Sequence, residues 1–164
     1  MKKRIFLIGL VLFLVSSFCY AQETDLGPNI FDLGVSFIIG GGVNAPALHF
    51  QYVGYLFNDF GLAVNMNVGG FGGGIADADF VMDFLFGVAW KLKINNFQIP
   101  MAAGMYFLAA IGGDIGVGAG INASYYYNIS NNFYLFGRVQ IGFCLGMDKS
   151  FIVFTPSLGG SISF

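Results

Sequence analysis

Charged side chains are scarce in this sequence. Asp, Glu, Lys and Arg make up 10% of its 164 residues, whereas a soluble domain carries about 25%. Much of the folded surface is therefore expected to face something other than water. The formal net charge is −2, and loss of Lys2, Lys3 and Arg4 with an export segment would leave four basic residues against nine acidic ones, or −5. No basic patch remains, which argues against nucleic-acid binding.

Cysteine and histidine are rare, with two cysteines and one histidine. Cys19 lies in the N-terminal segment that we expect to be removed, so Cys144 would be the only thiol of the mature chain. A single thiol excludes an intramolecular disulfide and a thiolate metal cluster. The glycine runs lack the Lys-Ser/Thr pair that completes a phosphate-binding loop. The sequence therefore predicts no cofactor, no metal site and no catalytic residue.

The first 21 residues have the features of a secretory signal peptide. Three basic residues precede the apolar stretch 5–15, whose eleven residues are too few to span a bilayer. Ala21 supplies a small residue just before the cleavage point. The alternative, a lipoprotein signal with lipid on Cys19, is disfavoured by the bulky Phe18 before it. We therefore expect a signal peptide over 1–21, a short periplasmic leader over 22–29 and one domain over 30–164.

Apolar residues are abundant, at 56%, and they alternate with period two. At the C-terminus, Ile152, Phe154, Leu158, Ile162 and Phe164 share one face, and the other face is mostly small and polar. Strands are predicted over 30–40, 47–57, 60–69, 79–92, 97–108, 115–128, 133–144 and 151–164. A transmembrane β-strand needs about 9–11 residues, and closure of an even number leaves no open edge in lipid. The predicted fold is an all-β, eight-stranded antiparallel up-and-down transmembrane β-barrel.

Two features of the chain bear on this fold. Pro100 and Pro156 fall inside predicted strands, and each removes a ladder hydrogen bond, so a bulge is expected at one or both. Residues 97–113 form a run of seventeen without a charge, which leaves a helical membrane protein as the alternative architecture. The glycines, Pro100 and the alternation on both sides of this run favour strands.

Three short turns recur at Asn58, Asn95 and Asn131, 37 and 36 residues apart. Each joins Asn to Asn or Asp, which tolerate the positive φ of hairpin turns, just before a Phe. With Tyr-Leu-Phe-Asn-Asp at 55–59 and the terminal Phe164, the pattern resembles the small OmpA-, OmpX- and OmpW-type outer-membrane β-barrels. The resemblance implies export to the bacterial outer membrane, with outer-membrane lipid and the barrel-assembly machinery as partners. It also implies an assembly signal at Phe164 and Ile162, and periplasmic short turns and termini.

The predicted strand faces divide into a lipid side and a lumen side. On the lipid side we expect an aromatic girdle of Trp90, Tyr125, Tyr127 and Phe133. In the lumen we expect a hydrogen-bonded plug, because an eight-stranded barrel is only wide enough for its side chains to fill it. Its predicted members are Asp32, His49, Gln51, Asn65, Asn67, Asp83, Lys91, Asn122, Tyr126, Arg138 and Gln140. A buried arginine needs an acid, so Arg138 is expected to pair with Asp83, or alternatively with Asp32.

Three functions fit this architecture. The first is a non-enzymatic barrel with a filled lumen, a structural or surface-interaction role and a surface ligand that the sequence does not identify. The second is a narrow transport barrel for small hydrophobic ligands, as in OmpW-type barrels, with apolar lumen residues Ile38, Val81, Tyr106, Leu108 and Phe151. The third is a membrane-embedded lipid-modifying enzyme in which His49 would act with Ser36 and Asp83. No spacing supports that triad, which only geometry can identify.

Overall fold

The computed structural model describes residues 26–70, 80–94, 97–111, 115–146 and 149–164. The predicted signal peptide, residues 22–25 of the predicted leader and the turn at Asn95 lie outside these ranges.

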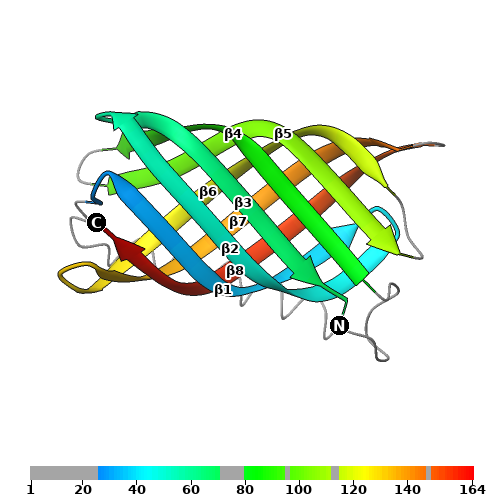
Figure 1. Ribbon diagram of the computed structural model, residues 1–164, viewed down its shortest axis with the longest axis horizontal. Helices are drawn as coiled ribbons and strands as arrows, with labels where there is room; N and C mark the ends of the chain where they lie inside the picture. The colour runs from blue at the N-terminus through cyan, green and yellow to red at the C-terminus, as the bar shows by residue number, and fades with distance from the viewer. Residues whose placement is uncertain (1–25, 71–79, 95–96, 112–114, 147–148) are drawn as a thin grey trace.

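Eight strands form one closed antiparallel barrel in chain order (Figure 1). β1 and β8 pair and close the ring, which confirms the predicted fold class. The strands are β1 (Asn29–Gly40), β2 (Val43–Phe57), β3 (Phe60–Gly69), β4 (Phe80–Ile94), β5 (Phe97–Ile111), β6 (Gly116–Ser130), β7 (Phe133–Gly146) and β8 (Ser150–Ser163). The helical alternative is wrong, since β5 occupies residues 97–111. Among the described residues, no helix is long and apolar enough to cross a membrane.

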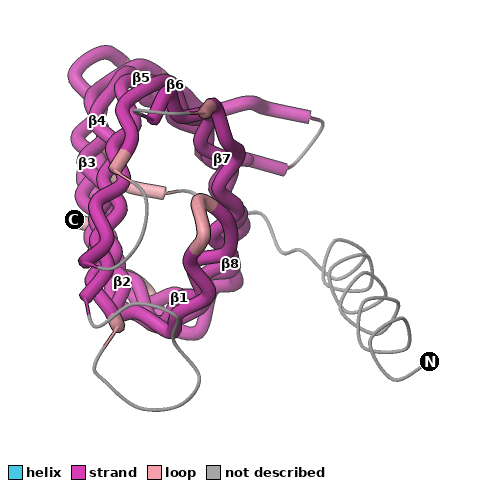
Figure 2. The backbone as a smooth tube through the Cα atoms, turned by 90° about the vertical axis from the view of Figure 1, so that its right-hand side faces the viewer, coloured by secondary structure: helices cyan, strands magenta, loops and turns pink. Residues whose placement is uncertain are grey.

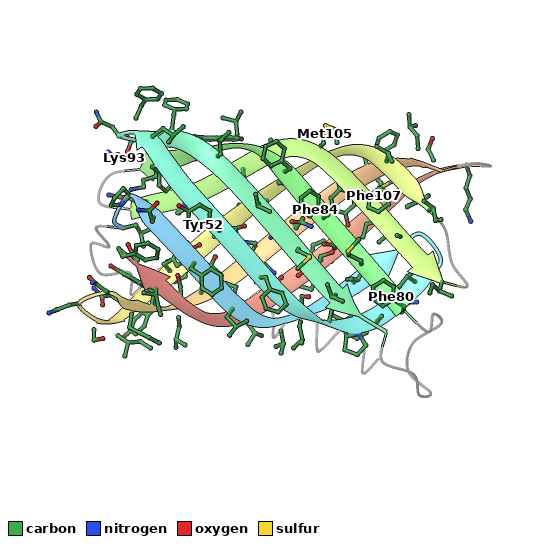
Figure 3. All side chains as sticks on the ribbon, in the orientation of Figure 1. Tyr52, Phe80, Phe84, Lys93, Met105 and Phe107 are labelled. Atoms are coloured by element: carbon green, nitrogen blue, oxygen red, sulfur yellow. The ribbon has the colours of Figure 1, made fainter. Side chains whose placement is uncertain are left out.

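The wall of the barrel separates buried residues from exposed ones at alternate positions. In β2, His49 and Gln51 are buried inside, whereas Leu48 and Tyr52 are 46% and 44% exposed outside. Met105 of β5 projects away from the barrel (Figure 3) and is 67% exposed. Seen along its length, the backbone encloses an oval interior (Figure 2). The apolar face of every strand therefore lies on the outside, as a barrel in lipid requires.

The two ends of the barrel differ in their connections. One end, here called the turn end, carries the turns at Asn58 and Asn131 and the C-terminal Phe164 (Figure 1). The other, the loop end, carries the connection between β1 and β2 and the longer one between β3 and β4. The predicted loop over 41–46 is wrong, because β2 begins at Val43. Gly40, Gly41 and Gly42 have φ of 119°, 62° and 73°, and glycine adopts such angles without steric cost, so two residues make the turn.

The prolines do not introduce the expected bulges. Pro156 pairs with β7, and its missing N–H coincides with a gap in the β1–β8 ladder between Ser36 and Ile39 that leaves the register unchanged. Pro100 lies just beyond Met101, where the pairing of β5 with β6 stops. The register shifts occur instead beside two turns, between Tyr55 and Phe57 and between Asn128 and Ser130. Each proline thus occupies a place where the ladder is already interrupted.

Candidate functional site

The middle of the lumen is filled by one connected group of polar side chains, here called the polar belt. All eight strands contribute to it, and every member is at most 3% exposed. Its members are Asp32, His49, Gln51, Asn65, Asn67, Asp83, Tyr106, Asn122, Ser124, Tyr126, Arg138, Gln140 and Thr155. Because these side chains bond across the ring, the belt joins opposite walls of the barrel as well as neighbouring strands.

Arg138 of β7 is the most connected side chain of the belt. Its Nη2 forms an ion pair with Asp32 Oδ2 in which both side chains are fully buried. Its Nε donates to Ser124 Oγ at 2.7 Å, its Nη1 lies 2.6 Å from His49 Nε2, and its Nη2 donates to Tyr126 Oη at 3.1 Å. The guanidinium therefore ties β7 to β1, β2 and β6.

The partner of Arg138 is Asp32, so the preferred pairing with Asp83 was wrong. Ser157 of β8 lies opposite Arg138, and Ser36 of β1 lies opposite Ser157. Asp32 is therefore only two strands away around the ring, nearer the turn end. The long arginine side chain reaches it past β8 without crossing the barrel to β4. This choice depends on the register of β7, β8 and β1, which alternation alone does not give.

The contacts of His49 define its tautomer. An arginine side chain has no acceptor, so His49 Nε2 must accept the hydrogen bond from Arg138. The proton then lies on Nδ1, which donates to Asn67 Oδ1 at 2.7 Å. Ser36, the proposed nucleophile, instead donates to the Ala47 carbonyl at 3.5 Å. Both ring nitrogens of His49 are thus engaged by belt residues, and neither contacts Ser36 or Asp83.

Hydrogen bonds between side-chain amides connect His49 to the two buried acids, Asp32 and Asp83. Asn67 Nδ2 donates to Asn65 Oδ1 at 3.1 Å, and Asn65 Nδ2 donates to Gln51 Oε1 at 3.2 Å. Gln51 Oε1 also accepts from Asn122, and Gln51 Nε2 donates to Asp32 Oδ2 at 3.5 Å. One orientation of each amide satisfies all of these bonds, so the chain of donors and acceptors is self-consistent.

Asp83 of β4 is held by uncharged donors. Its Oδ1 accepts from Asn67 at 2.5 Å and from Gln140 at 3.2 Å, and its Oδ2 accepts from Thr155 at 2.7 Å and from Tyr106 at 3.1 Å. Four such bonds offset much of the cost of burying a carboxylate. Within the described residues, two belt atoms, Asp32 Oδ1 and Gln140 Oε1, lack a hydrogen-bond partner.

Ten of the eleven predicted lumen residues lie in the belt, and Lys91 does not. Lys91 lies at the turn end, where its Nζ donates to the Leu26 carbonyl at 2.7 Å. The predicted set does not include Tyr106, Ser124 and Thr155, which also belong to the belt. Each occupies a lumen-facing position, so alternation was the signal that could have included them. The sequence predicts Tyr106 only as part of the apolar lining of the lumen.

Packed apolar layers lie on both sides of the belt. Toward the loop end, buried residues include Ile38, Val43, Val81, Leu108 and Val153. Toward the turn end, Tyr126 packs edge-on against Tyr134 with ring centroids 6.3 Å apart, and Phe136 packs against His49 at 5.3 Å. The lumen thus has an apolar layer, a polar belt and an aromatic layer, in order from the loop end.

The predicted girdle residues lie near the turn end on the outer face of the wall. Tyr127 and Phe133 are 46% and 48% exposed, and Trp90 and Tyr125 are half-buried. The predicted assembly residues, Phe164 and Ile162, are 61% and 42% exposed at the same end. The described residues contain no group of three or more His, Cys, Asp or Glu side chains that could hold a metal ion.

Comparison with known proteins rests on structure, since no family model and no curated protein matches the sequence. The fold is similar to the crystal structure of Neisserial surface protein A, with a TM-score of 0.65 and 12% identity over 86% of this chain and all of that one. It is similar to the outer-membrane protein AlkL in lipid bilayers, with a TM-score of 0.59 and 11% identity over 88% of this chain and 94% of that one. It is also similar to Ail of Yersinia pestis, with a TM-score of 0.52 and 16% identity over 85% of this chain and all of that one. The chain therefore has the fold of the small eight-stranded outer-membrane β-barrels.

Proposed function

We propose that this protein is an integral β-barrel of the bacterial outer membrane with a non-enzymatic, structural or surface-interacting role. The observation that carries the proposal is the polar belt, which fills the lumen with side chains from all eight strands. Because side chains occupy the lumen, the protein would bind a partner through its outer surface and its loops. Engagement of both nitrogens of His49 supports a role without catalysis, and His49→Ala should leave lipid A modification in cells unchanged.

The wall supports placement in lipid. Large apolar side chains are exposed on all eight strands, including Leu33, Leu48, Leu62, Val88 and Met105. An exposed apolar surface this continuous would drive a water-soluble protein to associate, whereas it matches the hydrocarbon core of a bilayer. Outer-membrane lipid is therefore the partner proposed for the wall, and the barrel-assembly machinery is the partner proposed for Phe164 and Ile162.

Electrical recording tests the filled lumen directly. Purified protein inserted into a planar lipid bilayer should carry no steady ion current, since an ion would have to break the belt and cross both apolar layers. A wide porin inserted under the same conditions serves as the positive control, because its lumen is an aqueous channel. A steady porin-like current through this protein would refute the filled lumen.

A second candidate function, transport of a small hydrophobic ligand, is favoured by one observation. Among the described residues, the lumen side chains nearest the loop end are mostly apolar, with Ile38, Val81 and Leu108 fully buried. An apolar ligand could be bound there only if it displaced these side chains. Saturable binding of an apolar fluorescent probe by the refolded protein, weakened by Leu108→Asn, would favour transport over the structural role.

A further inference from the structure

Residues 26–29 cross the mouth of the lumen at the turn end. Leu26 is only 2% exposed although it precedes the first strand. Gly27 N donates to Ser163 Oγ at 2.6 Å, and the Pro28 carbonyl accepts from Tyr55 N at 2.7 Å. Asn29 and Phe164 exchange two backbone hydrogen bonds of 3.0 Å each. This segment, here called the strap, thus bonds to β2 and to the C-terminal end of the chain within four residues.

Lys91 of β4 fastens the buried end of the strap. Its Nζ donates to the Leu26 carbonyl at 2.7 Å and lies 4.4 Å from the centre of the Tyr55 ring. A charged donor gives a stronger hydrogen bond than a neutral one, and an ammonium over an aromatic face adds cation–π attraction. Lys91 therefore links the strap to the wall on the side away from Ser163.

We propose that the strap is a lid over the turn-end mouth of the lumen and that Lys91 is its latch. Leu26 supplies the apolar stopper, and the hinge is at Asn29, where β1 begins. Opening would break the bonds at Leu26, Gly27 and Pro28 while leaving the polar belt intact, because within the described part of the chain no belt side chain bonds to the strap. The aromatic layer beneath would then meet the solvent of that side.

The two lysines at this end supply a matched pair of variants. Lys93 lies two residues further along β4 and forms an exposed ion pair with Asp59 at 2.9 Å, away from the strap. Lys91→Met keeps a long side chain and removes the ammonium that bonds to Leu26. Lys93→Met makes the same change of charge and shape without touching the strap. Leu26→Ala removes the stopper itself and keeps Lys91.

Two measurements on the purified, folded barrel test the lid. The first is hydrogen exchange of the Tyr55 amide, which is bonded to the strap. Loss of one charge-assisted hydrogen bond should make this exchange about tenfold faster in Lys91→Met, with no comparable change in Lys93→Met. The second is labelling of a cysteine placed at Ala89, a fully buried inward residue of β4, by a small thiol reagent. It should be faster in Lys91→Met and in Leu26→Ala than in Lys93→Met.

The outcomes separate cleanly, provided that heat-modifiable migration on a gel shows each variant to be folded. Faster exchange together with faster labelling supports the lid. Equal exchange in the two lysine variants overturns Lys91 as the latch. If exchange of the Tyr55 amide is faster but labelling at position 89 is faster in neither Lys91→Met nor Leu26→Ala, the strap is not a lid.

Discussion

Arg138 illustrates what a single residue contributes to this barrel. Both members of its ion pair with Asp32 are fully buried, and removal of one partner from a buried pair typically costs about 3–5 kcal/mol. We predict that Arg138→Ala lowers the free energy of unfolding by at least about 2 kcal/mol. This value is below the typical range because water entering the vacated space would partly solvate the unpaired Asp32. The measurement is a denaturant titration of the refolded protein in detergent.

Lys93→Ala is the control for this prediction. The side chains of Lys93 and Asp59, which form an ion pair, are 53% and 32% exposed. Surface ion pairs of this kind contribute about 0–1 kcal/mol to stability. The double variant Arg138→Met with Asp32→Asn should unfold closer to wild type than Arg138→Ala, since neither charge is left unpaired. Equal stability of Arg138→Ala and wild type would show that the belt does not hold the barrel together.

The sequence predicts the side on which a residue lies better than the residue that it contacts. Alternation places Arg138, Asp32 and Asp83 inside, and the structure has all three there. The choice between the two acids depends on strand register and on the reach of one side chain. Tyr106 shows the same limit, because its ring lines an apolar lumen while its hydroxyl reaches Asp83.

At the scale of the strands, missing side chains on β6 and β7 make room for Tyr106. A Cβ at Gly142 would lie 2.2 Å from Tyr106 Cε1. Gly142→Ala should therefore displace the ring and its bond to Asp83, with a loss of about 1–3 kcal/mol typical of overpacking. Gly137, on the outer face of the same strand, has nothing within 4 Å of its Cβ position. Gly137→Ala should be neutral or stabilise by up to about 1 kcal/mol.

Thermal unfolding of both glycine variants in the same detergent measures this difference. The expected order of midpoints is Gly137→Ala at or above wild type and Gly142→Ala below it. If both variants melt together, Tyr106 is not packed against β7 as described.

Phe164, which directly follows β8, allows a role in assembly to be tested apart from a role in stability. The Phe164 side chain is 61% exposed, and the described bonds of this residue are the two backbone bonds with Asn29. Phe164→Ala keeps those bonds, so it should leave the stability of the refolded barrel within about 0.5 kcal/mol of wild type. In cells it should sharply reduce the amount of heat-modifiable barrel if the side chain is the assembly signal. Phe133→Ala, at an equally outward aromatic of the same end, should assemble normally.

The strands themselves were largely predictable, and their ends were not. Period two identified all eight because each has one face toward lipid and one toward the lumen. The sequence does not predict the early start of β2, because residues 41–46 contain Gly and Pro, which usually mark a loop. The three consecutive glycines with positive φ shorten the turn instead, and Pro46 lies just beyond the first β2–β3 pair, Ala47 with Gly69.

At the scale of the whole molecule, the strands and the belt do not determine which end of the barrel faces the cell exterior. The β3–β4 connection distinguishes the ends, although the β1–β2 turn at the loop end is as short as those at the turn end. The turns between β2 and β3 and between β6 and β7 are two residues long, whereas the loop-end connection between β3 and β4 spans residues 70–79. In outer-membrane barrels the short turns are periplasmic and the longer loops extracellular. The turn end, with the strap and Phe164, is therefore expected to face the periplasm.

Cysteine labelling in whole cells tests this orientation. In a Cys144→Ala background, Lys149→Cys places a thiol at the loop end and Asn131→Cys places one at the turn end, both at exposed positions. A membrane-impermeant thiol reagent should label position 149 in intact cells and position 131 only after the outer membrane is opened. Because lysed cells should label both, a difference in intact cells reports orientation and not reactivity. Labelling of position 131 alone in intact cells would invert the barrel and place the strap outside.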